Sequence, residues 1–183
     1  GPLLAIEKPQ RGVYRKVQTC GEGISRVVTS MNQPVVCIRQ VPGDAANSLL
    51  EAVLDACGFW ARLESVRRAR RLPRKRVAIV VKADLDVFNL ALPSGTDPQL
   101  VGHLATLLQR RGYRSITVLD ARNGRDDWLL NREPLMVADL LGYDFSGQLY
   151  EMAGDRDSGS ASDIWSGADF RINFAKNRTH ESQ

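Results

Sequence analysis

The sequence contains few of the residues that build metal and disulfide sites. It has three cysteines and two histidines among 183 residues, and no two cysteines form a CxxC pair. An odd number of widely spaced cysteines excludes a disulfide framework and a four-thiolate zinc or iron–sulfur site. We therefore expect reduced thiols, no metal site made by protein side chains alone, and no cofactor that the sequence can name.

Long apolar stretches are missing as well. The longest purely aliphatic run covers residues 77–81 and is far too short to cross a bilayer. The first residues show no basic region followed by an apolar stretch, so no secretion signal is visible. Gly1 and Pro2 are typical of the remnant left when a protease removes an expression tag. We expect no membrane partner and a cytoplasmic location.

The overall composition is that of a globular protein. Hydrophobic residues make up 43% and charged residues 25% of the chain, which excludes wholesale disorder. A chain of this length can bury one good core. Residues 3–34 mix Gly, Pro, Ser and charged residues, with one β-like stretch at residues 26–29. We expect residues 1–34 to be a mostly irregular N-terminal arm and residues 35–183 to be a single α/β domain.

Strand-like and helix-like patterns alternate from residue 35 onward. β-Branched and apolar runs predict strands at residues 35–38, 77–81, 115–120 and 168–175. Helical spacing of apolar residues predicts helices at residues 49–57, from Thr96-Asp97-Pro98 to residue 111, and at residues 135–141. Residues 154–167 are rich in Gly, Ser and Asp and predict a mobile loop. The alternation is typical of a doubly wound, mostly parallel α/β sheet with helices on both faces.

Ligands of such sheets bind outside the carboxyl ends of the strands, and this rule selects the candidate site residues. The selected residues follow three of the expected strands or begin the helix after one of them. They are Lys82, Asp84, Thr96, Asp97, Asp120, Lys176, Asn177, Thr179 and His180. Such a set can bind an anion and supply acid–base groups. Thr96 and Asp97 are also explained as a simple helix cap, and a divalent ion on Asp84 and Asp120 is a weaker alternative.

The basic segment supports a different class of function. Residues 62–82 hold nine Lys or Arg and one acid, whereas residues 120–169 hold eleven acids and four bases, so charge is polarised along the sequence. Residues 62–76 could bind the phosphates of nucleic acid, although no aromatic residues are interleaved after Trp60. A solvated helix end or a subunit contact is the favoured explanation of the segment. A non-catalytic scaffold, or a subunit that docks an acidic partner through this segment, is a further alternative.

Several of these segments together resemble the domain of unknown function 362 family. The resemblance rests on residues 77–84, Thr96-Asp97-Pro98, residues 112–120 and 168–173, and the Lys176…Thr179-His180 step. It implies an α/β fold and site roles for Lys176, Thr179 and His180. The ferredoxin-like cysteine motifs of many members are absent here. The chain is also distantly similar to the N-terminal domain of nickel-pincer lactate racemases, in which loop lysines and histidines hold a cofactor. Family chains usually extend further, which implies that this domain is truncated at its C-terminus.

We therefore expect a protein that binds a small ligand carrying a carboxylate or phosphate. Lys82 and Lys176 would neutralise the ligand, and Thr96 and Thr179 would form hydrogen bonds with it. His180 or Asp120 would move protons, with Lys176 as a further acid–base group. The sequence leaves open whether the protein is an enzyme, and it does not indicate an oligomeric state. Nucleic-acid binding is the less favoured alternative.

Overall fold

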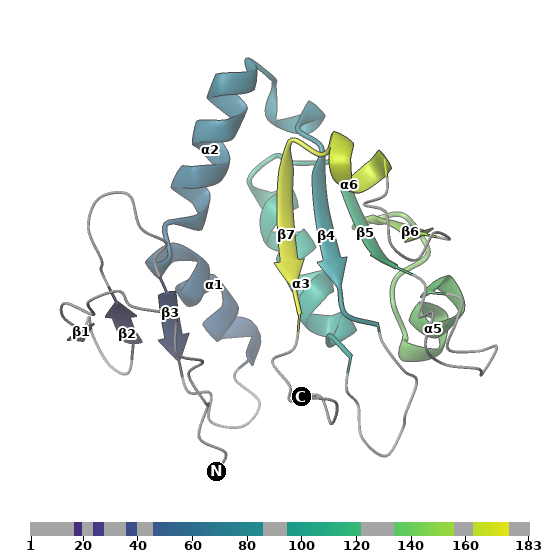
Figure 1. The fold of residues 1–183 in the computed structure, drawn as a ribbon, viewed down its shortest axis with the longest axis horizontal. Helices are drawn as coiled ribbons and strands as arrows, with labels where there is room; N and C mark the ends of the chain where they lie inside the picture. The colour runs from purple at the N-terminus through teal and green to yellow at the C-terminus, as the bar shows by residue number, and fades with distance from the viewer. Residues whose placement is uncertain are drawn as a thin grey trace, which may run out of the picture.

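The computed structural model describes residues 17–19, 24–27, 36–39, 46–85, 95–121, 134–155 and 163–175. Its centre is a sheet of four parallel strands, β4 (Ile79–Ala83), β5 (Ile116–Ala121), β6 (Glu151–Asp155) and β7 (Phe170–Phe174). The strands lie in the order β6-β5-β4-β7, and their carboxyl ends point the same way (Figure 1). The predicted α/β fold with a parallel sheet is confirmed.

The central strand β4 is buried on both faces. Ile79, Val80 and Val81 are each at most 2% exposed, and neighbouring strands pair with β4 on either side. An uninterrupted β-branched run predicts this environment, because neither row of alternating side chains faces water. By contrast, the edge strand β7 alternates, with Phe170 and Ile172 turned to the core and Arg171 exposed. A strand with one face toward solvent requires that alternation.

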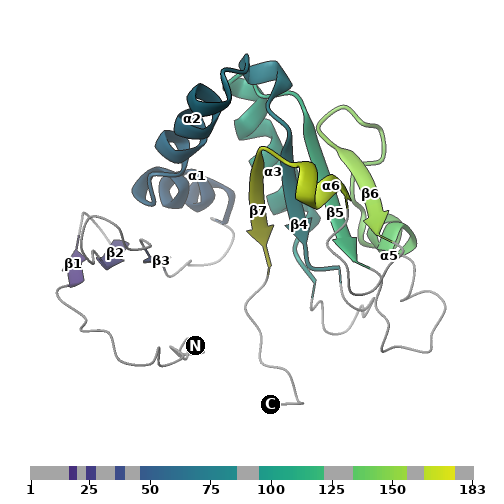
Figure 2. The ribbon, with the colours of Figure 1, turned by 45° about the horizontal axis from the view of Figure 1, so that its top comes forward.

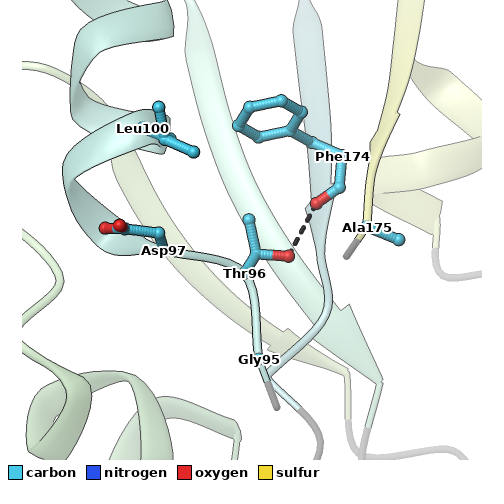
Figure 3. Close-up of a pocket in the computed structure, with 6 residues that line it drawn as sticks. All are labelled: Gly95, Thr96, Asp97, Leu100, Phe174 and Ala175. Carbon is cyan, nitrogen blue, oxygen red and sulfur yellow. Dashed lines mark hydrogen bonds between the residues drawn. The ribbon is translucent and has the colours of Figure 1, made fainter. Parts of the chain in front are cut away.

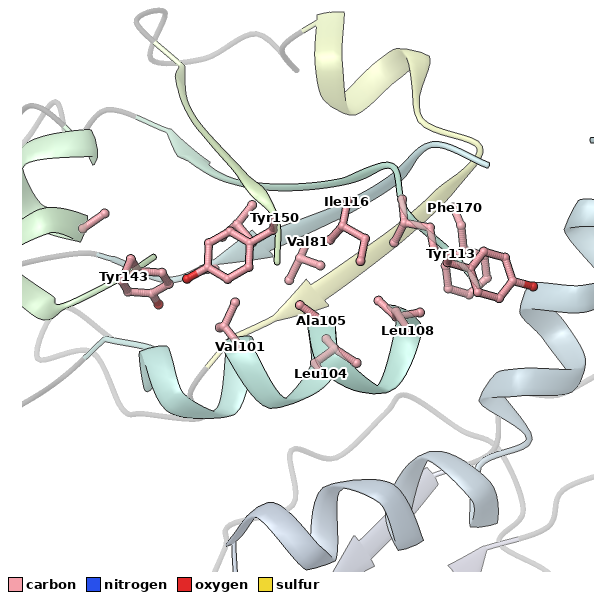
Figure 4. Packing of buried hydrophobic residues seen from close by; sticks show 14 of the residues in the cluster. Val81, Val101, Leu104, Ala105, Leu108, Tyr113, Ile116, Tyr143, Tyr150 and Phe170 are labelled. Carbon is pink, nitrogen blue, oxygen red and sulfur yellow. The ribbon is translucent and has the colours of Figure 1, made fainter. Parts of the chain in front are cut away.

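One face of the sheet is covered mainly by α3 (Pro98–Arg110). Its apolar stripe, which includes Val101, Leu104 and Leu108, packs against β4 and β5 to form the main core (Figure 4). Each such side chain stabilises the fold by about 1.5–3 kcal/mol when fully buried. Two further helices, α1 (Ala46–Ala56) and α2 (Phe59–Arg70), add to this core beside β7. The helices predicted near residue 49 and at Thr96-Asp97-Pro98 are thereby confirmed.

The opposite face carries a smaller cluster. Val80, Leu119 and Ala168 are buried there, and Trp165 packs against them from the short helix α6 (Asp163–Gly167). Figure 4 shows α3 and α6 on opposite sides of the sheet. The predicted arrangement with helices on both faces is therefore confirmed. A last helix, α5 (Pro134–Leu141), agrees with the prediction at residues 135–141 and contacts β5 and β6.

The expected strand at residues 35–38 forms, but in a different sheet. It is β3 (Val36–Arg39), and it pairs antiparallel with β2 (Ile24–Val27), which in turn pairs with β1 (Val17–Thr19). The place of an edge strand in the parallel sheet is taken by β7 instead. The segment expected to be a mostly irregular arm thus contains two short strands. Strand identity is readable from local pattern, but pairing partners depend on contacts distant in the sequence.

Several elements were not predicted, among them β6, α2 and α6. The sequence of β6, EMAGD, has no β-branched residue, so its local pattern does not indicate a strand. The helix α2 carries mostly charge and buries only Leu63 fully, so its apolar periodicity is weak. The short helix α6 lies inside the expected loop at residues 154–167. Among the described residues, no helix combines the length and the apolar character needed to span a bilayer.

Candidate functional site

The strand order reverses at β4, whose carboxyl end lies beside that of its neighbour β7. After β4 the chain moves outward to β5 and β6 and then returns to the other side of β4 as β7. In an open α/β sheet, the carboxyl ends of two strands at such a reversal are the usual place of a ligand site. A pocket of about 280 Å³ lies there (Figure 3). Its lining consists of Gly95, Thr96, Asp97, Leu100, Phe174 and Ala175.

The pocket is formed by residues that lead into α3 and by the end of β7. Leu100 and the ring of Phe174 face each other across it, and Asp97 lies at its rim (Figure 3). The lining is therefore apolar on two sides, with a carboxylate beside it. A cleft with apolar walls and a few polar groups is typical of small-molecule sites, and the volume is close to the lower end of their usual range.

Thr96 holds the elements around the pocket together. Its hydroxyl donates to the carbonyl oxygen of Phe174 at 2.7 Å and accepts from the backbone N–H of Asp84 at 2.9 Å. Its own N–H donates to the Asp84 carbonyl oxygen at 2.6 Å. The Tyr143 hydroxyl donates to the carbonyl oxygen of Thr96 at 2.8 Å. Thr96 is 5% exposed, so these contacts join β4, β7 and the start of α3 in a nearly dry environment.

Asp97 is the N-cap of α3. Its carboxylate accepts a hydrogen bond from the backbone N–H of Gln99 at 2.8 Å, and Pro98 occupies the first helical turn, where its missing N–H costs nothing. The helix-cap interpretation is thus correct for Asp97 but wrong for Thr96, whose hydroxyl bonds to the backbone of Phe174 and Asp84 and not to the helix. The predicted ligand-binding role of the two residues stays a prediction, since a cap can also face a ligand.

Asp120 and Lys82 form a second polar group at the same edge. The Asp120 carboxylate is 10% exposed, accepts from the backbone N–H of Leu85 at 2.8 Å, and lies 3.3 Å from the Lys82 ammonium nitrogen. Lys82 itself is 40% exposed in its side chain, so water or a ligand can reach it. Neither residue lines the pocket. The structure therefore brings these two together, and separately brings Thr96 to the backbone of Asp84.

The carboxyl edge is acidic within the described residues. Burial is the main cause that raises the pKa of the Tyr143 hydroxyl above its usual value. Tyr150 and then the carboxylates of Asp120, Asp97 and Asp84 raise this pKa further. Tyr143 therefore stays protonated and donates its hydrogen bond to Thr96 across the physiological range. No cluster of three or more His, Cys, Asp or Glu side chains suited to a metal ion occurs in the part of the chain that the structure describes.

Four expected site residues fall outside the described ranges: Lys176, Asn177, Thr179 and His180. Their roles, and proton transfer by Asp120, stay predictions. The sequence did not single out Gly95, Leu100, Phe174 or Tyr143. Leu100 and Phe174 were recognised only as members of apolar patterns, and nothing local marked Tyr143, because the fold brings it to Thr96 from 47 positions away.

Comparisons of this chain with protein-family models, with curated proteins and with solved structures gave no match. The resemblance to the domain of unknown function 362 family therefore stays a hypothesis that rests on the residues quoted for it. Geometry and chemistry have to carry the functional argument.

Proposed function

We propose that the protein binds a small molecule in the pocket between the start of α3 and the end of β7. The observation that carries the proposal is the position of this pocket at the point where the strand order reverses. Its walls come from Leu100 and Phe174, which lie on elements far apart in the chain. An apolar part of the ligand would pack between them, and its polar part would extend out of the pocket toward solvent.

The finer part of the proposal is that the ligand carries a carboxylate or phosphate. Its support is Lys82, a half-exposed cation at the end of β4, together with Lys176, which follows β7 in the chain. The carboxylates of Asp84, Asp97 and Asp120 oppose an anion at this edge. Anion binding therefore depends on Lys82 and Lys176, and neutralising either lysine should weaken it strongly.

The Asp120 carboxylate accepts a hydrogen bond from the Leu85 N–H and pairs with the Lys82 ammonium. We therefore propose that Asp120 positions Lys82. Proton transfer is proposed for His180 and Lys176, whose chain positions follow the carboxyl end of β7. We also propose membership of the domain of unknown function 362 family. What supports it is that Thr96-Asp97-Pro98, the step quoted for that resemblance, begins α3 at this pocket.

A ligand screen by thermal shift tests the proposal. Each carboxylate or phosphate in the panel is paired with its neutral ester or alcohol. We expect at least one compound to raise the melting temperature in the wild type. Leu100→Trp should abolish that shift by filling the pocket, whereas Leu140→Trp should keep it, since Leu140 is 46% exposed on α5 and lies outside the lining.

Lys82→Gln separates the two parts of the proposal. If the ligand is anionic, this variant loses the shift given by the acid and retains the weaker shift given by its neutral partner. Equal shifts for both partners in the wild type would overturn the anionic part alone. A ligand that still binds the Leu100→Trp variant with unchanged affinity overturns the pocket assignment.

A further inference from the structure

The opposite edge of the parallel sheet, where the strands begin, is strongly basic. It is formed by the last turn of α2, the 3-10 turn η1 (Arg74–Arg76), and the end of α3 (Figures 1 and 2). Exposed cationic side chains gather on these three elements. They are Arg68, Arg70, Arg71, Arg74, Lys75, Arg76, Arg110 and Arg114, and we call this set the basic edge.

Direct contacts hold the three elements of the basic edge together. The Tyr113 hydroxyl, just after α3, donates to the Glu64 carboxylate of α2 at 2.8 Å. Arg74 of η1 packs on Gly112, where a Cβ would lie 3.7 Å from the Arg74 side chain. The backbone N–H of Ile79 donates to the carbonyl oxygen of Ser115 at 2.9 Å. The arginines of α2, η1 and α3 therefore belong to one surface.

Glu64 fixes the turn after α2. Its carboxylate accepts from the Arg67 guanidinium at 2.9 Å and from the Arg74 guanidinium at 2.7 Å, in addition to Tyr113. Arg67 also donates to the carbonyl oxygen of Leu72 at 3.1 Å. Arg67 and Arg74 thus hold residues 71–76 in place through Glu64 and Leu72. The other cations of the basic edge are carried on a backbone that these contacts fix.

The other cations of the basic edge form few ion pairs with described residues of the same chain. Arg70 lies 3.6 Å from Asp169 with its side chain 63% exposed. Arg68, Arg71, Lys75, Arg76 and Arg110 contact no acidic side chain within the described ranges. Five cations on one edge without internal partners repel one another, and an external polyanion would relieve that repulsion.

Arg71 is held in a backbone conformation that favours glycine. Its φ is 54° and its ψ is 36°, and it ends α2 with backbone hydrogen bonds to the last helical carbonyl oxygens. Glycine adopts this conformation freely, whereas a residue with a Cβ is strained there. The Arg71 side chain is exposed and forms no hydrogen bond or ion pair with another described residue. An external partner for its guanidinium accounts for both observations.

We propose that the basic edge binds the sugar–phosphate backbone of a nucleic-acid duplex without reading its sequence. Seven of its eight cations are arginines, whose planar guanidinium matches phosphate oxygens in a bidentate manner. Stacking on single-stranded bases needs exposed aromatic rings, and the described part of this edge offers none. Tyr113 is 1% exposed, and the Arg111 guanidinium covers the Trp60 ring at 3.7 Å.

The surface lies where β4 begins, just after η1, whereas the proposed ligand pocket lies at the carboxyl end of β7. Because no described residue belongs to both, variants of the basic edge leave the lining of the pocket intact. Failure of one proposal therefore leaves the other standing, and each can be tested in the same protein.

The test is the salt dependence of duplex binding, measured by fluorescence anisotropy with a labelled mixed-sequence DNA duplex of about 20 base pairs. About five phosphate contacts predict a slope near −4.5 in log K against log salt, or a loss of roughly 500-fold between 50 and 200 mM NaCl. The variant Arg68→Gln/Arg71→Gln/Lys75→Gln/Arg76→Gln should lower the slope to about −1 and the affinity at 50 mM by more than 100-fold. Its melting temperature verifies that it folds, since none of the four side chains has an acidic partner among the described residues.

Two single variants on α2 form the matched control. Arg68→Gln should reduce the slope by about 1, whereas Arg62→Gln, also exposed but in the first half of the same helix, should leave it unchanged. Four results would overturn the proposal: no binding at 20 mM salt, an unchanged slope in the fourfold variant, equal effects of Arg62→Gln and Arg68→Gln, or equal competition by polyglutamate of the same charge. The last result would assign the edge to an acidic protein surface instead.

Discussion

The hydroxyl of Thr96 donates a hydrogen bond to the carbonyl oxygen of Phe174 across 2.7 Å, although 78 positions separate the two residues in the chain. The same hydroxyl accepts from the backbone N–H of Asp84. One side chain therefore links the end of β4, the start of α3 and the end of β7, and it does so at the wall of the proposed ligand pocket. The stability of the fold and the shape of the pocket depend on this contact together.

Thr96→Val should destabilise the protein by about 1–3 kcal/mol, because it removes the hydrogen-bond partner of two partly buried backbone groups, the Phe174 carbonyl oxygen and the Asp84 N–H. Thr106→Val is the matched control. The Thr106 hydroxyl donates only to the carbonyl oxygen of Gly102 within α3, so its loss should cost less than about 1 kcal/mol. Urea unfolding measures both. Equal costs for the two variants would show that the link between β4 and β7 has no special weight.

Gly95→Ala should destabilise the protein by about 1–3 kcal/mol and weaken any ligand of the pocket. A Cβ at Gly95 would lie 2.8 Å from the carbonyl oxygen of Asp84, and that oxygen belongs to the backbone and cannot turn away. The chain before α3 would have to move. In Gly167→Ala the new methyl group meets nothing within 4 Å, so stability should change by less than about 1 kcal/mol. Thermal unfolding with and without ligand distinguishes the two; a Gly95→Ala protein with unchanged stability would contradict the close approach.

The helix that begins at Asp97 was predictable because its signal is local. A cap residue, a proline in the first turn and an apolar stripe all lie within fifteen residues. The strand β4 was predictable for the same reason. The fold class follows from the alternation of such segments, since few arrangements accommodate short strands separated by helices.

The walls of the pocket were not predictable, because they depend on which strands become neighbours. That β7 pairs with β4 and not with β6 is decided by packing across the whole sheet. The contact between Thr96 and Phe174 follows only from that pairing. The same limit applies to Glu64. Its ion pair with Arg67 can be expected from the sequence, because the two residues are three positions apart on one helix. Its contacts with Arg74 and Tyr113 arise only when the chain has folded.

The Glu64 carboxylate should make the free energy of unfolding fall at low pH. Hydrogen bonds from Arg67, Tyr113 and Arg74, in that order of effect, lower the pKa of Glu64 from 4.5 to about 2. A carboxyl whose pKa is lower in the folded state stabilises the fold above its unfolded pKa, and this stabilisation is lost as the pH falls from about 4.5 toward 2. Because the side chain is partly exposed, we expect about 1–2 kcal/mol.

Urea unfolding of the wild type and of Glu64→Gln at pH 7, 4 and 2 tests this. The wild type should be the more stable by about 1–2 kcal/mol at pH 7, and the difference should vanish near pH 2. Glu51→Gln is the control, because the Glu51–Arg111 pair spans 3.5 Å with both side chains at least a third exposed and should contribute less than about 1 kcal/mol. A difference between wild type and Glu64→Gln that stays constant with pH would exclude titration of Glu64 as its origin.

Arg71→Gly and Arg68→Gly should change stability in opposite directions while changing duplex binding in the same direction. Glycine at position 71 relieves the strain of a φ of 54°, so stability should rise by about 0.5–1 kcal/mol. Glycine at position 68 lies inside α2 and should lower stability by about 1 kcal/mol. Each variant removes one guanidinium from the basic edge, so each should reduce the slope of log K against log salt by about 1.

Urea unfolding and duplex anisotropy on the same two proteins provide the measurement. A protein that becomes more stable and binds duplex less well at Arg71→Gly shows that the strained arginine serves binding at the expense of stability. If Arg71→Gly gains stability and binds the duplex as before, the strain at Arg71 has no connection with nucleic acid, and its guanidinium is not part of the binding surface. If both variants lose stability, the left-handed conformation at Arg71 is not strained by its side chain.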